Sequence, residues 1–216
     1  MRSFSERNEK MNMNKVLFGL ASAACVACVT GCRTPTTRID LRNDTGAQVA
    51  AIDYRDLQEA ASAMLQSLLR SGRLDRTDGQ MYVLAIGKVK NDTMQRFDTD
   101  TLTSYITEEL MNSGKVMVTS AMADSADNRD NMVYGARSVR GNAEFNQATV
   151  AKTGQLVAPT HSLFGKIIQR EIHMDNGDKQ IEYYFQLRIT EIASGLQWWQ
   201  KQHLIGKRTD GRTPTW

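Results

Sequence analysis

A regular alternation of apolar and mostly polar side chains over residues 181–190 constrains the fold of this chain more than any other feature. The apolar positions recur at every second residue: Ile181, Tyr183, Phe185, Leu187 and Ile189. This period of two is that of a β-strand with one buried face. Asn176-Gly177 stands just before it and predicts a type I′ hairpin turn, which pairs this strand with another over residues 163–172. Ser194-Gly195 predicts a second turn and a third strand over 197–207, so this part of the chain is expected to form an antiparallel meander.

The part of the chain that precedes the meander predicts helices and strands in alternation. Apolar side chains follow a helical spacing at Leu57, Ala61, Met64, Leu65 and Leu68. Asp53 is the expected N-cap of this helix and Gly72 its expected end. Further along are an apolar strand expected to be buried on both faces (81–89), a helix with Leu102, Tyr105, Ile106 and Leu110 on one side (101–112), and a short strand (116–119). Together these elements predict the α+β class, with an antiparallel-rich sheet packed by helices.

The N-terminus has the form of an export signal. An almost uncharged run over 16–29 follows several basic residues and ends in Val29-Thr30-Gly31-Cys32, which resembles the lipobox of bacterial lipoproteins. That resemblance implies that 1–31 is a cleaved signal peptide and that Cys32 is lipidated. The alternatives are an uncleaved membrane helix or a buried helix, but the run is shorter than the roughly 17–25 apolar residues that cross a bilayer comfortably. Arg33 after the cysteine favours an outer-membrane anchor facing the periplasm over an inner-membrane one.

Processing at Cys32 changes the composition on which functional arguments rest. Removing 1–31 takes away four Lys or Arg and two Asp or Glu, which lowers the formal net charge from +3 to +1 and weakens any argument for nucleic-acid binding. Cys25 and Cys28 leave with the signal, so no disulfide or thiolate site is expected. Residues 32–52 are expected to be the lipidated cysteine with a short tether, and 53–216 a single globular domain.

Catalytic and metal-binding motifs were not found. The chain contains no Gly-x-Ser-x-Gly, Ser-x-x-Lys or His-Glu-x-x-His pattern and no phosphate-binding glycine loop. His161, His173 and His203 lack ligand spacing and are expected at strand edges or in solvent. Asp175, Asn176 and Asp178 fit a hairpin turn better than a calcium loop. The sequence therefore predicts a protein that is not an enzyme and holds no cofactor or metal.

Two regions offer candidate partner contacts. Residues 121–142 are polar and are expected to form a loop or an exposed helix, with a third helix over 142–152. Arg137 and Arg140 are candidate partner contacts there, although a solvated polar segment is the simpler interpretation. Trp198-Trp199 is expected to place one ring on each face of its strand, and Trp198 is the candidate partner anchor.

Several segments in order resemble the LpoB-type penicillin-binding protein activators. They are Asp53-Tyr-Arg-Asp-Leu, Val89-Lys-Asn-Asp-Thr93, residues 98–115, Leu163-Phe-Gly-Lys-Ile167, residues 183–192, Gly195 and Trp198-Trp199. The resemblance covers most of 54–207. It implies a domain similar to the N-terminal domain of TolB, in an outer-membrane lipoprotein without catalytic activity.

The resemblance also implies a partner. Members of this family bind a docking domain of a bifunctional, class A penicillin-binding protein and stimulate peptidoglycan synthesis, so a monomeric domain with this partner is expected. The alternative is a secretion-pore or envelope-assembly lipoprotein that shares the same domain. A pore would need additional amphipathic membrane strands, whereas the meander is expected to be committed to a core.

Overall fold

The computed structural model describes residue 40 and residues 49–122 and 129–212. The expected signal peptide 1–31, the lipidation residue Cys32 and most of the tether 32–52 lie outside this part of the chain. Within it, no helix has both the length and the hydrophobicity needed to cross a bilayer.

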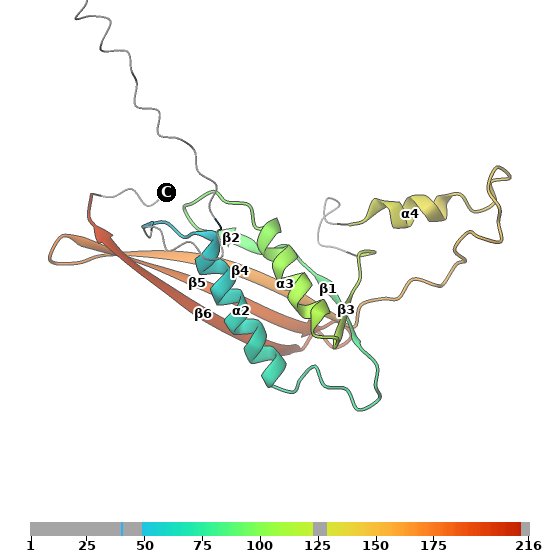
Figure 1. Cartoon of the computed structure of the whole chain (residues 1–216), viewed down its shortest axis with the longest axis horizontal. Helices are drawn as coiled ribbons and strands as arrows, with labels where there is room; N and C mark the ends of the chain where they lie inside the picture. The colour runs from blue at the N-terminus through green and yellow to red at the C-terminus, as the bar shows by residue number, and fades with distance from the viewer. Residues whose placement is uncertain (1–39, 41–48, 123–128, 213–216) are drawn as a thin grey trace, which may run out of the picture. The chain divides into compact units, whose positions relative to one another are not determined.

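A mixed sheet of six strands organises the fold (Figure 1). The elements in chain order are α2 (Tyr54–Arg70), β1 (Tyr82–Ile86), β2 (Lys90–Asp92), α3 (Asp100–Asn112), β3 (Val116–Val118), α4 (Asn131–Ser138), β4 (His161–His173), β5 (Asp178–Glu191) and β6 (Gln197–Asp210). The strand order is β3-β1-β4-β5-β6, with β2 also paired to β4. The pairs β4–β5 and β5–β6 are antiparallel, and the other pairs are parallel. The predicted α+β class with an antiparallel-rich sheet is confirmed.

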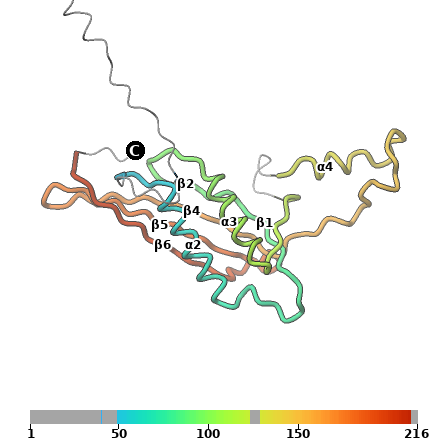
Figure 2. Tube along the Cα trace, in the orientation of Figure 1, coloured from blue at the N-terminus to red at the C-terminus, as the bar shows by residue number. Residues whose placement is uncertain are grey.

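Helices α2 and α3 pack together on one face of this sheet (Figures 1 and 2). The Asp53 side chain accepts from the Asp56 N–H at 3.0 Å, and the Asp56 side chain accepts from the Asp53 N–H at 2.9 Å. This reciprocal capping box satisfies two backbone donors at the start of α2. Gly72 follows the helix with a φ of 70°, a conformation that glycine adopts without steric cost. The predicted start and end of this helix are therefore confirmed.

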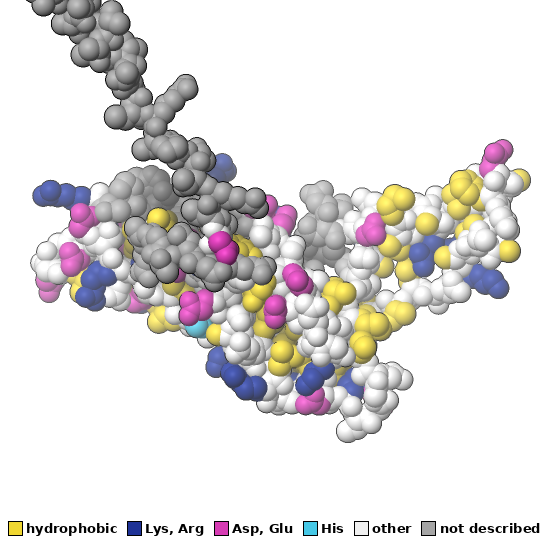
Figure 3. Space-filling view, in the orientation of Figure 1, with side chains coloured by type: hydrophobic (Ala, Val, Ile, Leu, Met, Phe, Trp, Pro, Cys, Tyr) yellow, Lys and Arg dark blue, Asp and Glu magenta, His cyan; other side chains and the backbone are white. Residues whose placement is uncertain are grey.

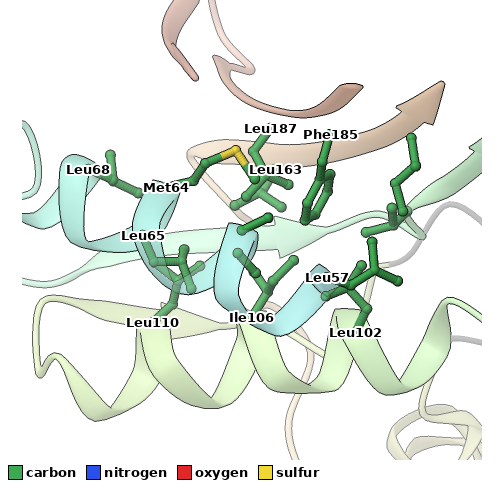
Figure 4. Close-up of a cluster of buried hydrophobic side chains, with 14 of the residues drawn as sticks. Leu57, Met64, Leu65, Leu68, Leu102, Ile106, Leu110, Leu163, Phe185 and Leu187 are labelled. Carbon is green, nitrogen blue, oxygen red and sulfur yellow. The ribbon is translucent and has the colours of Figure 1, made fainter. Parts of the chain in front are cut away.

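The hydrophobic core lies between these helices and the sheet. Figure 4 shows leucine and methionine side chains of α2 meeting Leu102, Ile106 and Leu110 of α3 and Leu163, Phe185 and Leu187 of the sheet. The five apolar residues at alternate positions of β5 are all fully buried, as the sequence predicted. Each such side chain stabilises the fold by about 1.5–3 kcal/mol relative to an exposed one.

Lys207 of β6 binds the backbone just before α2 and the Asp56 carboxylate, and we call this set of contacts the clasp. The Lys207 ammonium donates to the Val49 carbonyl at 3.1 Å and to the Ala51 carbonyl at 2.8 Å, and it pairs with the Asp56 carboxylate at 2.5 Å. The Ile52 N–H donates to Gln95 Oε1 at 3.1 Å. The backbone just before α2 is thus fixed to both the last strand and the segment after β2.

The first hairpin differs from the predicted type I′ turn. That turn needs positive φ at two residues, but in the described residues only glycines have positive φ, and here this residue is Gly177 at 88°. The Gly177 N–H donates to the Met174 carbonyl at 3.0 Å, and the Met174 N–H donates to the Asp178 carbonyl at 2.9 Å. This is the pattern of a three-residue loop that ends in a glycine bulge.

Two other expectations were wrong. The strand expected over 81–89 is limited to β1, where only Leu84 is fully buried, because just one face of the sheet is covered by helices. The helix expected over 142–152 is replaced by turns. The Asn142 side chain accepts from the Glu144 N–H, and the Asn146 side chain accepts from the Ala148 N–H, each at 3.0 Å. Such local bonds give the backbone an alternative to helical hydrogen bonding.

Candidate functional site

The face of the sheet opposite α2 and α3 is the candidate functional site, and we call it the open face. It consists of the side chains of β4, β5 and β6 that alternate with the buried ones. In the part of the chain that the structure describes, α2 and α3 contact the sheet on the other side, and α4 buries none of its residues. The open face is therefore the broad surface that the fold leaves uncovered.

An apolar row crosses the middle of the open face. Ile168 of β4 is the register partner of Tyr184 of β5, which in turn is the partner of Leu204 of β6. Leu204 is 54% exposed, and the other two side chains are half-buried by their neighbours. Directly opposed side chains on adjacent strands are in contact distance. The row is therefore a continuous apolar strip across three strands.

Charged side chains flank this row on both sides. Four cations and three carboxylates occupy outward positions of the three strands: Lys166, Arg170, Arg188, Arg208, Asp178, Glu182 and Asp210. The Arg188 guanidinium carbon lies 4.6 Å from the centroid of the Phe164 ring, a cation–π contact. The Lys166 ammonium lies 2.7 Å from the Asp92 carboxylate at the margin of the face, and this bond lowers the pKa of Asp92. Charges of both signs thus lie beside the apolar row.

The one carboxylate in the centre is held by hydrogen bonds. The Tyr184 hydroxyl donates to Glu182 Oε2 at 2.5 Å, and the Gln180 amide donates to Glu182 Oε1 at 2.8 Å. Both bonds favour the ionised form, so the pKa of Glu182 is lowered, first by the tyrosine and then by the glutamine. The same contact raises the pKa of Tyr184. Arg208 donates to Gln180 at 3.4 Å, which links the network to the edge strand.

A glycine of the edge strand lies beside Glu182. Gly206 of β6 is the register partner of Glu182, and a Cβ placed on it would meet no atom within 4 Å. The φ of Gly206 is not positive, so the backbone does not require glycine here. The missing side chain leaves Glu182 and the end of the apolar row accessible from the edge.

The open face contains side-chain types that are common in protein interfaces. Tyrosine, arginine and large apolar side chains are enriched in protein interfaces and their hot spots. In the described ranges, no group of three or more His, Cys, Asp or Glu side chains is placed to hold a metal ion. The open face is therefore a candidate docking surface.

The predicted anchor Trp198 lies at the far end of β6, partly inside the core. Its ring centroid is 4.7 Å from that of His161 and 5.3 Å from that of Tyr82, and the Arg73 guanidinium lies 5.9 Å away. The pairing of β5 with β6 shifts by one residue here, which is a β-bulge, and both Trp198 and Trp199 pack against the core. The expectation of one ring on each face was wrong; the partner role of Trp198 stays a prediction.

Arg137 and Arg140 bond to backbone carbonyls near α4. Arg137 donates to the Val133 carbonyl at 3.1 Å, and Arg140 donates to those of Ala151 and Lys152 at 2.7 and 2.9 Å. The exposed helix expected in this region is confirmed for α4, whereas residues 123–128 lie outside the described part. Trp198 and the two arginines have separate sets of neighbours in the described residues, and the partner role of the arginines stays a prediction. Cys32 lies outside those residues.

His161 differs from its expected solvated position. It is 4% exposed, and burial lowers its pKa, whereas His173 is exposed and His203 is half-buried. His161 is the first residue of β4, which agrees with the expected position at a strand end, but it is not solvated because it lies on the buried side of that strand, in register with Leu84 of β1. Asp175, Asn176 and Asp178 lie at the hairpin loop, where the Asn176 amide donates to Asp178 at 2.8 Å.

A groove on the helix side is a second, smaller feature. It has a volume of about 580 Å³ and lies between α3 and the chain after β3, lined by Met111, Val118 and Met122 among others. Figure 3 shows the helix side, with hydrophobic side chains gathered near β3 and on the α4 segment. Its lining also includes two carboxylates, Asp100 and Glu108.

The open face was missed in the sequence, although a signal for it exists. Residues 163–172 carry apolar side chains at both odd and even positions, with Leu163 and Ile167 facing the core and Phe164, Ile168 and Ile172 facing outward. A solvated face would have only polar residues at the outward positions. Apolar residues on both sides of this strand therefore indicate that its outward side is a candidate interaction surface.

Comparison with protein families gave a match that covers most of the chain. The model of a family described as the peptidoglycan-synthase activator LpoB matches residues 56–205. No curated protein sequence matched the chain.

Several solved structures are similar to this one. The LpoB C-terminal domain from Escherichia coli is 16% identical, with a TM-score of 0.41, and the match covers 69% of this chain and 98% of that chain. The corresponding domain from Salmonella enterica is also 16% identical, with a TM-score of 0.37 and coverages of 69% and 94%. The NMR structure of E. coli LpoB is 14% identical, with a TM-score of 0.37 and 83% coverage of both chains.

Proposed function

Because the chain belongs to the LpoB family of peptidoglycan-synthase activators, we propose that it binds and stimulates a bifunctional, class A penicillin-binding protein. The match of the family model over 56–205 is the observation that carries this proposal. The open face supports it, because an activator needs a surface for its synthase and does not need a reaction centre of its own.

The proposed mechanism is allosteric and requires no catalysis by this chain. A docking protein shifts a synthase toward its active state only if it binds that state more tightly than the inactive one. A tenfold shift in that equilibrium requires a difference of about 1.4 kcal/mol between the two affinities.

The open face is the proposed contact surface for the synthase. The apolar row Ile168–Tyr184–Leu204 provides area that gains from burial, and the flanking arginines provide directional contacts. Both are carried by the three long strands, whose opposite side is locked into the core. The surface is thus presented in a fixed form, which lowers the entropic cost of binding.

The proposed location is the cell envelope, with Cys32 as the lipid anchor on the outer membrane and the domain facing the periplasm. Residues 1–31 would be removed and 32–52 would form the tether. A tether of this length reaches at most about 65–70 Å when fully extended and spans roughly 25 Å as a flexible coil. The domain would therefore work close to its membrane, and its partner must come within that distance.

The test is a polymerisation assay with lipid II and each purified class A penicillin-binding protein of the host. The full lipidated chain, in detergent, is added at increasing concentration, and glycan products are measured over time. A saturable increase with one synthase is expected. If none of the synthases binds the chain or responds to it, the proposed function is wrong.

A further inference from the structure

We infer that two copies of this chain exchange α4 reciprocally, so that α4 of each copy docks into the groove beside α3 of the other. This inference goes beyond the proposed function and does not depend on it, because it concerns contacts between copies of this chain. It differs from the monomeric domain that the family resemblance implied.

The segment between β3 and β4 exposes apolar side chains. We call residues 129–158 the arm, and none of them is buried. Five large apolar side chains of the arm have exposed fractions between 39% and 75%: Met132, Tyr134, Phe145, Leu156 and Val157. Figure 3 shows hydrophobic side chains gathered on this segment. Exposed apolar side chains gathered in one segment are typical of an interaction site.

The arm begins at the margin of the groove of its own chain. The Asp130 N–H donates to the Ser120 carbonyl at 3.1 Å, and the Tyr134 hydroxyl donates to the Ala121 carbonyl. Ser120 is among the described residues that line the groove, whereas none of these residues comes from α4. A copy that receives α4 in its groove therefore has its own α4 next to the donor. This arrangement makes the exchange reciprocal and closes it at two copies.

The groove and α4 have complementary side chains. The lining of the groove includes four apolar and two acidic side chains: Ile86, Met111, Val118, Met122, Asp100 and Glu108. On α4, Met132, Val133 and Ala136 are three or four residues apart and share one side of the helix. An amphipathic helix binds other proteins by laying such a side into an apolar groove. The groove volume of about 580 Å³ lies within the roughly 300–1,000 Å³ of sites that enclose a ligand.

The charges of the arm and of the groove are opposite in sign. The arm contains four Lys or Arg and two Asp or Glu, which gives it a formal net charge of +2. Asp100 and Glu108 are the only charged side chains among the described residues that line the groove. Asp100 already pairs with Lys88 at 2.9 Å, so Glu108 is the expected partner of a cation beside α4, Arg129 or Arg137. Opposite charges favour the arm of a second copy over an acidic segment of another protein.

Single-cysteine variants of the full lipidated chain test which copy supplies α4. One variant carries Met111→Cys in the groove, and a second, with a different affinity tag, carries Met132→Cys on α4. In the control, Met94→Cys takes the place of Met111→Cys, at an exposed methionine that does not line the groove. The lipidated Cys32 has no free thiol. The two chains are mixed, treated with a short bismaleimide at 50 mM salt, and scored for covalent pairs that carry both tags.

The Met111→Cys chain is expected to give roughly tenfold more mixed pairs than the Met94→Cys control, because docking raises the effective concentration of the two thiols. Adding Glu108→Gln to the Met111→Cys chain, or raising the salt to 300 mM, is expected to lower this yield severalfold. The melting temperature should stay that of the wild type, because the three methionines are exposed.

Each contrary result overturns a defined part of the inference. Equal yields from the Met111→Cys and Met94→Cys chains would show that α4 is not exchanged. A chain that carries both Met111→Cys and Met132→Cys and links only within itself would show that α4 covers its own groove, which excludes the second copy. An unchanged yield with Glu108→Gln would show that Glu108 does not hold the arm. The assay contains no synthase, so its failure is distinct from a failure of the proposed function.

Discussion

Replacing Gly165 with alanine should destabilise the domain, although alanine is normally acceptable in a strand. Gly165 lies on the buried side of β4, where β2 joins the sheet. A Cβ on Gly165 would lie 2.8 Å from Val89 Cγ2 and 3.1 Å from Leu187 Cδ2. Val89 and Leu187 are themselves buried, so neither side chain can move into solvent. Overpacking of this kind costs about 1–3 kcal/mol.

Urea unfolding followed by circular dichroism measures this cost. With a slope of about 2 kcal/mol/M, Gly165→Ala should lower the midpoint by roughly 0.5–1.5 M. Gly206→Ala is the matched control, because its added Cβ meets no atom within 4 Å, and its midpoint should stay level or rise slightly.

A double-mutant cycle identifies the cause of the loss. In a Val89→Ala background the closest contact is gone, so Gly165→Ala should cost at least about 1 kcal/mol less than it does in the wild type. An unchanged midpoint for Gly165→Ala, or an equal cost in both backgrounds, would refute the close approach of β2 and β4 as the reason for the glycine.

Three further predictions concern Asp53, Lys207 and His161. Asp53→Ala removes the N-cap of α2 and should lower the free energy of unfolding by about 1 kcal/mol, measured in urea; Asp53→Asn should keep most of it. Lys207→Met breaks the clasp and leaves Asp56 without this partner, so the free energy of unfolding should fall by about 1–3 kcal/mol. The double variant Lys207→Met with Asp56→Asn should recover part of that stability. Burial lowers the pKa of His161 below the ordinary value of 6.5. The stability that the neutral, buried imidazole contributes is therefore complete above pH 6.5, and it is lost as the pH falls through the lowered pKa. The melting temperature should therefore fall from pH 7 to pH 5 more steeply in the wild type than in His161→Phe, and equal slopes would contradict this.

The features that could be predicted from the sequence are those fixed by neighbouring residues. Asp53 and Asp56 have the spacing of a capping box, and Gly72 follows where a helix must end, so the limits of α2 were readable. The alternation over 181–190 determined both the strand and its buried side. In each case, a short stretch of sequence favours one local structure, and the contacts made in the folded domain preserve that structure.

The features that could not be predicted depend on residues far apart in the chain. The bulge at Trp198 exists because β5 and β6 change register, and neither strand alone shows that. The open face arises because both long helices are placed on the same side of the sheet. The pairing of Gly206 with Glu182 forms only across a hairpin. The candidate site is therefore a property of the assembled sheet, whereas its individual strands are properties of the sequence.

The one-sided sheet also has a consequence for how such proteins can diverge. Successive residues of β5 lie in different environments, because Phe185 is buried in the core while Tyr184 lies on the open face. A substitution at Tyr184, Arg188 or Leu204 alters the open face without disturbing the packing of α2 and α3. Descendants of one ancestral domain can therefore acquire new partners by changing every second residue of three strands, while selection for folding acts on the residues between them.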